Sequence, residues 1–149
     1  MADSKTAKAR LRLKTIATGI GADDLTLEAA RIYLGCRRSD EAWAEAAALQ
    51  AGAPVINIGS ASLGFSGSSN PLVVECLMTV PLGAEAAQTW TNVDNLVTAL
   101  RAAWLNAANY PSGEVKAQLC DYEPYTHELR GDLTIVRVNL LVAFENPDA

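Results

Sequence analysis

The single histidine, His127, is the first residue to consider for catalysis, because its side chain most readily moves a proton near neutral pH. It lies beside Glu128 and close to Tyr125 in the stretch EPYTHELRGD. A general base needs a nucleophile within hydrogen-bond reach, and the sequence offers none at a suitable spacing. We therefore predict that His127 lies in a surface turn. A small-molecule-binding cleft lined by His127, Tyr125 and Glu128 is kept as an alternative.

Metal-ligating residues are sparse. Cys36, Cys76 and Cys120 are far apart, odd in number and form no CxxC pair, so we expect buried, reduced thiols. The acidic pairs at 23–24 and 40–41 lack the spacing of a calcium loop and are interpreted as helix caps. We predict no metal and no cofactor.

The stretch GSASLGFSGSSN, residues 59–70, is glycine-rich and could in principle cradle a phosphate. It has no Lys or Arg, and it precedes a strand instead of opening a helix, so the helix dipole that such sites use is missing. A flexible contact loop is the better interpretation. The tripeptide Arg130-Gly131-Asp132 is expected to be a glycine turn. No GxSxG, HExxH, Walker or GxGxxG pattern occurs, and we predict that the chain is not an enzyme.

The 149 residues predict a single domain, 1–149, with flexible ends at 1–5 and 146–149. Half of the residues are hydrophobic and 19% are charged, which is typical of a globular protein. No stretch approaches the roughly 18–20 apolar residues of a membrane span, and no apolar segment follows the basic N-terminus as in a secretory signal. We expect a protein that is made in a cytoplasm and has no membrane partner.

The net charge of −5 is unevenly spread. Residues 1–14 hold five Lys and Arg against one acid, which leaves 7 basic and 16 acidic residues for the rest, a charge of about −9. The basic segment could touch nucleic acid or an acidic patch on a neighbouring subunit, although a solvated first turn of helix explains it as well. The acidic body argues against duplex DNA as the main partner.

Hydrophobic spacing predicts the elements of the first half. We expect a helix from Thr6 to Thr18, a short strand in ARIYLG, a helix in CRRSDEAWAEAAALQAG, and a strand from Pro54 to Ser60. A loop over residues 61–70 then leads into the strand PLVVECLMTVPLG, and the two strands form a long hairpin.

The segment WTNVDNLVTALRAAWLNAANYPSG predicts the longest helix, with Thr91 as its N-cap, Asp94 completing an acidic capping box, and Pro111 and Gly113 ending it. Two strands follow, Val115 to Tyr122 and Asp132 to Glu145, separated by a turn. In the last strand, the even-numbered residues from Thr134 to Phe144 form an almost wholly apolar face.

These elements predict an α+β fold, a mostly antiparallel sheet of about four to five strands with two main helices packed on one face. The apolar face of the last strand would lie under the helices. Its other face, with Arg137 and Asn139, would face solvent or a neighbour. Exposed sheet edges invite association, which closed symmetric assembly can use.

The order of elements resembles the tail terminator, or tail completion, proteins of long-tailed bacteriophages. The similarity covers about residues 6 to 145. It depends on the helix KARLRLKTIATGI, the strand with PVINIG, the loop and strand PLVVECLMTV, the helix WTNVDNLVTALRAAWLN and the final strand GDLTIVRVNLLVAFE. The segment SDEAWAEAAALQAG departs from that family, because it is longer and more helical than expected.

The resemblance implies a structural virion protein, assembled in the host cytoplasm and located in the tail or neck. It implies a homo-oligomeric, hexameric ring that caps the tail tube protein, stops its polymerisation and offers a docking surface to the neck or connector protein. Genomic DNA would pass through without sequence-specific binding. The predicted interface residues are Gly59, Ser60, Leu63, Phe65, Ser68, Asn70, Arg137 and Asn139. A neck or head–tail connector subunit is an alternative within the virion, and a small-molecule-binding α+β domain is the alternative from another class.

Overall fold

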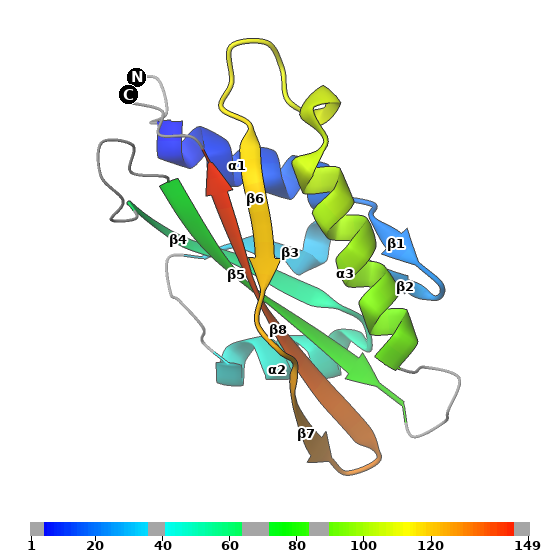
Figure 1. Ribbon diagram of the computed structural model, residues 1–149. Coiled ribbons are helices and arrows are strands. Elements are labelled where there is room, and N and C mark those ends of the chain that lie inside the picture. Colours follow the sequence, from blue (N-terminus) through cyan, green and yellow to red (C-terminus); the bar gives the residue numbers. More distant parts are fainter. Residues whose placement is uncertain (1–4, 36–40, 64–71, 84–89, 145–149) are drawn as a thin grey trace.

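The structure is a computed structural model that describes residues 5–35, 41–63, 72–83 and 90–144. Its three α-helices agree in number and order with the prediction, and two short 3-10 helices accompany them. In chain order the elements are α1 (Lys5–Ala17), β1 (Gly21–Ala22), β2 (Leu25–Thr26), η1 (Ala29–Arg31), β3 (Ile32–Leu34), α2 (Glu41–Ala51), β4 (Val55–Leu63), β5 (Leu72–Leu82), α3 (Trp90–Leu105), η2 (Ala107–Asn109), β6 (Ala117–Tyr122), β7 (Thr126–Arg130) and β8 (Leu133–Phe144) (Figure 1).

The main sheet has six strands in the order β3-β4-β5-β8-β6, and β7 also pairs with β8. Only the short β3–β4 pair is parallel, and the other pairs of this sheet are antiparallel. The predicted α+β class with a mostly antiparallel sheet is confirmed, and the sheet has more strands than the four to five expected. The long β4–β5 hairpin is confirmed too. However, β4 continues to Leu63, so the predicted loop of residues 61–70 begins as strand.

The last strand, β8, lies between β5 and the edge of the sheet that β6 and β7 form. It pairs with β5 along its whole length, while its other side pairs first with β7 and then with β6. The predicted apolar face is confirmed, because Val136, Val138, Leu140, Val142 and Phe144 are all fully buried. This alternation keeps one face of β8 in the core and turns the other face away from it.

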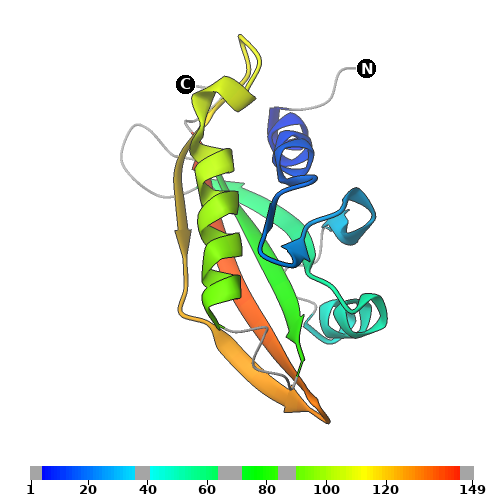
Figure 2. The ribbon, with the colours of Figure 1, turned by 90° about the vertical axis from the view of Figure 1, so that its right-hand side faces the viewer.

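The segment EPYTHELRGD contains a strand, so its prediction as a turn was wrong. Thr126–Arg130 forms β7, and the turn to β8 consists of Gly131 and Asp132 alone, with Gly131 at a φ of 61°. A two-residue hairpin turn favours a residue with positive φ, which glycine adopts without strain. The expected glycine turn in the Arg130-Gly131-Asp132 tripeptide is therefore confirmed. The strand itself was missed because its sequence is mostly polar. The β7–β8 hairpin extends beyond the helices (Figures 1 and 2).

Strands β6 and β7 share one edge of the sheet and are separated by a bulge. Tyr122 is opposite Leu140, and Thr126 is opposite Arg137. Three residues, 123–125, therefore face the two residues 138–139 of β8, and the Glu123 N–H donates to the Asn139 carbonyl at 3.0 Å. An extra residue of this kind bends an edge strand and interrupts its hydrogen bonding.

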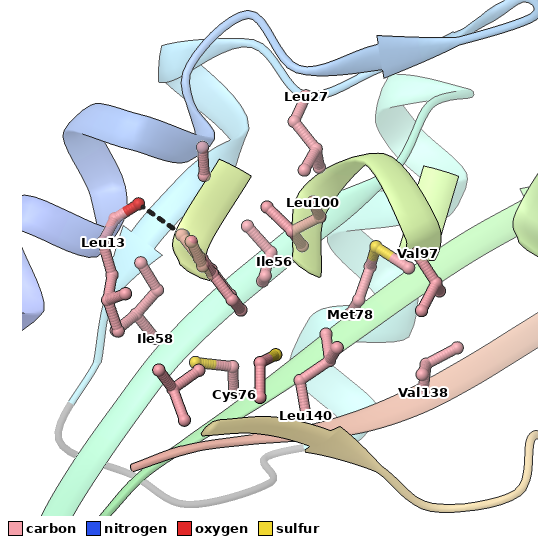
Figure 3. Close-up of a cluster of buried hydrophobic side chains, with 14 of the residues drawn as sticks. Leu13, Leu27, Ile56, Ile58, Cys76, Met78, Val97, Leu100, Val138 and Leu140 are labelled. Atoms are coloured by element: carbon pink, nitrogen blue, oxygen red, sulfur yellow. Dashed lines mark hydrogen bonds between the residues drawn. The ribbon is translucent and has the colours of Figure 1, made fainter. Parts of the chain in front are cut away.

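Helices α1 and α3 pack together over the buried face of β8, as the prediction of two helices on one face required. The indole Nε1 of Trp104 donates to the Leu13 carbonyl at 3.1 Å, and both side chains are fully buried. Figure 3 shows Leu13, this hydrogen bond and the surrounding apolar side chains. Hydrophobic spacing predicts that one side of α3 is buried, with Val93, Leu96, Val97, Leu100, Trp104 and Ala107 or Ala108. The first five are buried, whereas Ala107 and Ala108 lie in η2 and are exposed.

The ends of α3 differ from the prediction. The helix begins at Trp90, which places Thr91 inside the first turn, so the proposed capping box from Thr91 to Asp94 was wrong. The helix ends at Leu105, well before Pro111, because Asn106 caps the 3-10 helix η2 by accepting from the Ala108 N–H.

The acidic pair Asp23-Asp24 was predicted to cap a helix and instead forms the turn between β1 and β2. Asp23 has a φ of 57°, which aspartate tolerates better than most residues. The side-chain amides of Asn92 and Asn95 on α3 donate to Asp24 and Asp23 at 3.3 Å and 3.0 Å. The pair thus ties this small hairpin to α3. Of the second pair, Asp40 lies outside the described residues.

Helix α2 packs on the opposite face of the sheet, against β4 and β5. Figure 2 shows α2 and α3 on opposite sides of β5. Ala44 and Ala48 of α2 are buried, and they lie outside the main core cluster under α1 and α3. The sheet therefore has a large core on one face and a second, smaller apolar cluster on the other.

Candidate assembly surfaces

Three of the predicted interface residues, Gly59, Ser60 and Leu63, lie in β4 and not in a loop. Gly59 is buried at a shift in the β4–β5 register between Ile58 and Ala61, and Leu63 pairs with Leu72 as the last residue of the strand. Phe65, Ser68 and Asn70 lie outside the described residues. The role of these six residues in an interface remains a prediction.

Arg137 was predicted to face solvent or a neighbouring subunit, and the structure shows a different environment. Its guanidinium Nη2 donates to Glu45 Oε2 on α2 at 2.7 Å and to Glu128 Oε2 on β7 at 3.0 Å. The side chains of Arg137 and Glu45 each keep only 11% of their exposure. The sequence could not show this contact, because it depends on α2 folding over the second face. Asn139 is more open and donates to the Glu123 carboxylate at 3.2 Å.

The structure does not bring the three residues of the predicted small-molecule cleft together. Successive residues of a strand, such as His127 and Glu128, face opposite sides. Glu128 contacts Arg137 on the α2 side, whereas Tyr125 and His127 contact Trp90 of α3. His127 is on strand β7, not in a surface turn, so that prediction was wrong.

An aromatic cluster joins the start of α3 to the edge formed by β6 and β7. The ring of Trp90 stacks on Tyr125 at 6.0 Å and meets His127 edge-on at 5.3 Å. Tyr122 lies 5.9 Å from Tyr125, and the guanidinium carbon of Arg101 is 5.2 Å from the Tyr122 ring. Burial, together with the nearby Asp94 carboxylate, raises the pKa of Tyr125. The rings pack on one another, so they fix the edge against α3.

The part of the second sheet face that lies beyond α2 carries four apolar and two acidic side chains, and no other described element covers it. Strand register places Val73, Ala143 and Leu119 in one row across β5, β8 and β6. Glu75, Leu141 and Asp121 form the next row. We call these six residues the sheet patch. Leu119 is 54% exposed, Asp121 is exposed, and the other four are half-buried.

The outer side of α1 is a second exposed surface. Ala9, Leu13 and Ala17 bury the inner side in the main core, whereas Leu11 is 47% exposed. Lys8 and Lys14 lie one turn before and one turn after Leu11, and residues three apart are neighbours on a helix. We call Lys8, Leu11 and Lys14 the helix triplet. Sequence reasoning identified this segment only as basic. The signal for the triplet was the regular spacing of its three residues.

The thiols in the described part of the chain are buried, as predicted for Cys76 and Cys120. Burial raises the pKa of Cys120 to about 11 and raises that of Cys76 further. Cys36 lies outside the described residues. Within those residues, no group of three or more His, Cys, Asp or Glu side chains is placed to hold a metal ion.

None of the helices in the described ranges is long and apolar enough to cross a bilayer.

The fold and these surfaces define an α+β protein with a large core on one face of the sheet and two exposed surfaces, each with leucine beside charged groups, basic on the helix triplet and acidic on the sheet patch. No family model matches the sequence, and no curated protein matches it. Among solved structures, the chain is similar to a chain of one described as "Virion of native gene transfer agent (GTA) particle". The identity is 10% and the TM-score 0.41, over 95% of this chain and 92% of that chain. A similarity of this size does not establish a shared fold.

Proposed function

We propose that this chain is a structural virion protein whose copies form a ring of six at the end of a phage tail tube. The ring stops polymerisation of the tube protein and gives the neck or connector protein a surface to bind. It acts by burying surface between subunits and by blocking the tube end, with no chemical turnover.

The observation that carries the proposal is the sheet patch, which no other element within the described ranges covers. Leu119 and Leu141 present apolar side chains across two neighbouring strands, although the main core on the opposite face of the same sheet is complete. Contiguous exposed apolar surface on a soluble domain marks an interaction site. The order of elements, which resembles that of tail terminator proteins, supports the tail tube as the structure to which the ring binds.

The charge distribution fits a ring through which DNA moves. The chain has a net charge of −5, and five of its 12 basic residues lie before residue 15. DNA affinity comes mainly from Lys and Arg contacts to phosphates. An acidic body therefore leaves DNA free to pass without sequence-specific binding. The basic α1 is available for contacts between subunits instead.

The predicted contact segment, residues 59–70, is narrowed by the observed length of β4. Because β4 extends to Leu63 and pairs with Leu72, residues 59–63 belong to a strand, and 64–71 lie outside the described residues. We propose that this shorter segment contacts the tube or the next ring. Deleting residues 65–70 should leave the free energy of unfolding nearly unchanged and impair capping. Normal tail termination by the deleted variant would refute this assignment.

The test of the proposed function is the mass of the purified protein, alone and with the tail tube protein of the same virus, by light scattering and negative-stain imaging. Six copies at one end of a tube of normal length support capping. Rings that ignore the tube and bind a portal-side protein favour a neck subunit. A monomer that ignores both proteins would refute an assembly role.

A further inference from the structure

We infer that the helix triplet of one copy docks on the sheet patch of the next copy, and that this contact closes the ring; the inference rests on the proposed function for the ring itself. The occupant of the patch is thus a second copy of this chain. Three features of the described residues support the pairing: charge, spacing and position in the fold.

The charges of the two surfaces are complementary. In the helix triplet, Leu11 lies between Lys8 and Lys14, and α1 contains no acidic residue. In the second row of the sheet patch, Leu141 lies between Glu75 and Asp121. An apolar centre flanked by two ammonium groups thus faces an apolar centre flanked by two carboxylates. Complementary charge of this kind orients partners and excludes wrong ones.

The spacings of the two surfaces also agree. Lys8 and Lys14 are six residues apart on a helix, which corresponds to about 9 Å along its axis at 1.5 Å per residue. Glu75 and Asp121 flank β8 on either side, which corresponds to about 9.5 Å at 4.7–4.9 Å per strand. A helix that crosses the strands can therefore align both charged pairs while Leu11 contacts Leu141.

The two surfaces cannot meet within one copy. Helix α1 packs on the core face of the sheet through Ala9, Leu13 and Ala17, and its triplet points away from that face. The sheet patch lies on the opposite face, beside α2. The contact is therefore between different surfaces of two copies, and such heterologous contacts form rings when the rotation between copies closes.

Substitutions at the two central leucines test the pairing without regard to the direction of the helix on the patch. Leu11→Glu places a third carboxylate against Glu75 and Asp121. Leu141→Lys places a third ammonium group against Lys8 and Lys14. Each variant alone should weaken self-association at least tenfold in sedimentation velocity. Mixing the two variants should restore it, because wild-type surfaces meet at one junction and the introduced carboxylate meets the introduced ammonium group at the other.

The matched control is Leu129→Glu, which replaces a side chain that is 73% exposed on β7 and belongs to neither surface. It should leave self-association within twofold of wild type. Circular dichroism melts of all variants check that they are folded, and a variant that unfolds is replaced by Leu11→Gln or Leu141→Gln, for which the same loss is expected.

The outcomes separate the inference from the proposed function. Weaker self-association of each single variant, with self-association restored in the mixture of the two, supports the contact. Rings that form normally with either single variant, or variants that stay dissociated when mixed, overturn the contact and leave the ring in place. A wild-type chain that is monomeric at all concentrations, with and without the tube protein, overturns both.

Discussion

Arg137 joins α2 to the sheet, and removing its charge gives a stability change that can be estimated from the structure. Its guanidinium group is 2.7 Å from Glu45, and both side chains are 11% exposed. Arg137→Met keeps much of the apolar stem and removes the cation beside a Glu45 carboxylate that is shielded from water. Loss of one partner from a buried ion pair costs about 3–5 kcal/mol. Because both groups keep some contact with water, we expect the lower end, about 3 kcal/mol.

The assay is urea unfolding combined with calorimetry. A loss of about 3 kcal/mol corresponds to a fall in Tm of roughly 6–12 °C for a domain of this size. Adding Glu45→Gln to Arg137→Met should recover more than half of the loss, since a neutral amide is less costly to bury than a carboxylate that has lost its cation. Glu128→Gln is the control, because that side chain is 41% exposed and should cost less than about 1 kcal/mol.

Two results would refute this account of Arg137: a cost below about 1 kcal/mol for Arg137→Met, or no compensation of that cost by Glu45→Gln. Either result would mean that apolar contacts alone hold α2 on the sheet. The double-mutant cycle distinguishes an ion pair from apolar contacts alone, since only a direct interaction gives a coupling energy between Arg137 and Glu45.

Three further changes test other parts of the fold. Trp104→Phe removes the 3.1 Å hydrogen bond to the buried Leu13 carbonyl and should lower the free energy of unfolding by about 1–3 kcal/mol in urea; no measurable loss would contradict that role. Gly35→Ala places a methyl group in the space of the Asn57 side-chain amide and should cost about 1–3 kcal/mol, whereas Gly52→Ala, with open space around it, reports only the strain of its φ of 62°. Burial raises the pKa of Cys120 from 9.0 to about 11, so the thiol of the unfolded chain loses its proton at a lower pH than the thiol of the folded chain. The contribution of Cys120 to stability is therefore fully present below pH 9. It should fall between pH 9 and 11 by up to about 1.4 kcal/mol per pH unit. Melts at pH 8, 9 and 10 should show a shallower slope for Cys120→Ala, and an unchanged slope would contradict the assignment.

The main core could be predicted from the sequence, because the strands and helices that form it show clear hydrophobic periodicity. The alternation in β8 and the helical stripe from Val93 to Trp104 specify which side of each element is buried, and the structure confirms both. Periodicity of this kind depends only on local geometry. It therefore predicted the α+β class and the two helices on one face.

The second face could not be predicted in the same way. Strand β7 is mostly polar. Its Glu128 pairs with Arg137 of β8, and its His127 packs on Trp90 of α3. Both contacts join β7 to other elements, so they cannot be predicted from the hydrophobic periodicity of the strand itself. The position of α2 was open for a related reason, since its alanines fit equally well on any small apolar surface. The sheet patch, too, became visible only when register aligned its rows across three strands.

The separate apolar cluster under α2 has a consequence for local opening of the chain. Its buried helix residues include Ala44 and Ala48, whose small side chains remove little apolar area from water. Elements with few buried contacts open at a lower free energy than the whole domain. The amide protons of α2 should therefore exchange with solvent faster than those of β8. Each opening of α2 would extend the sheet patch toward Arg137, so the area of this face that a partner can reach depends on the population of the open state.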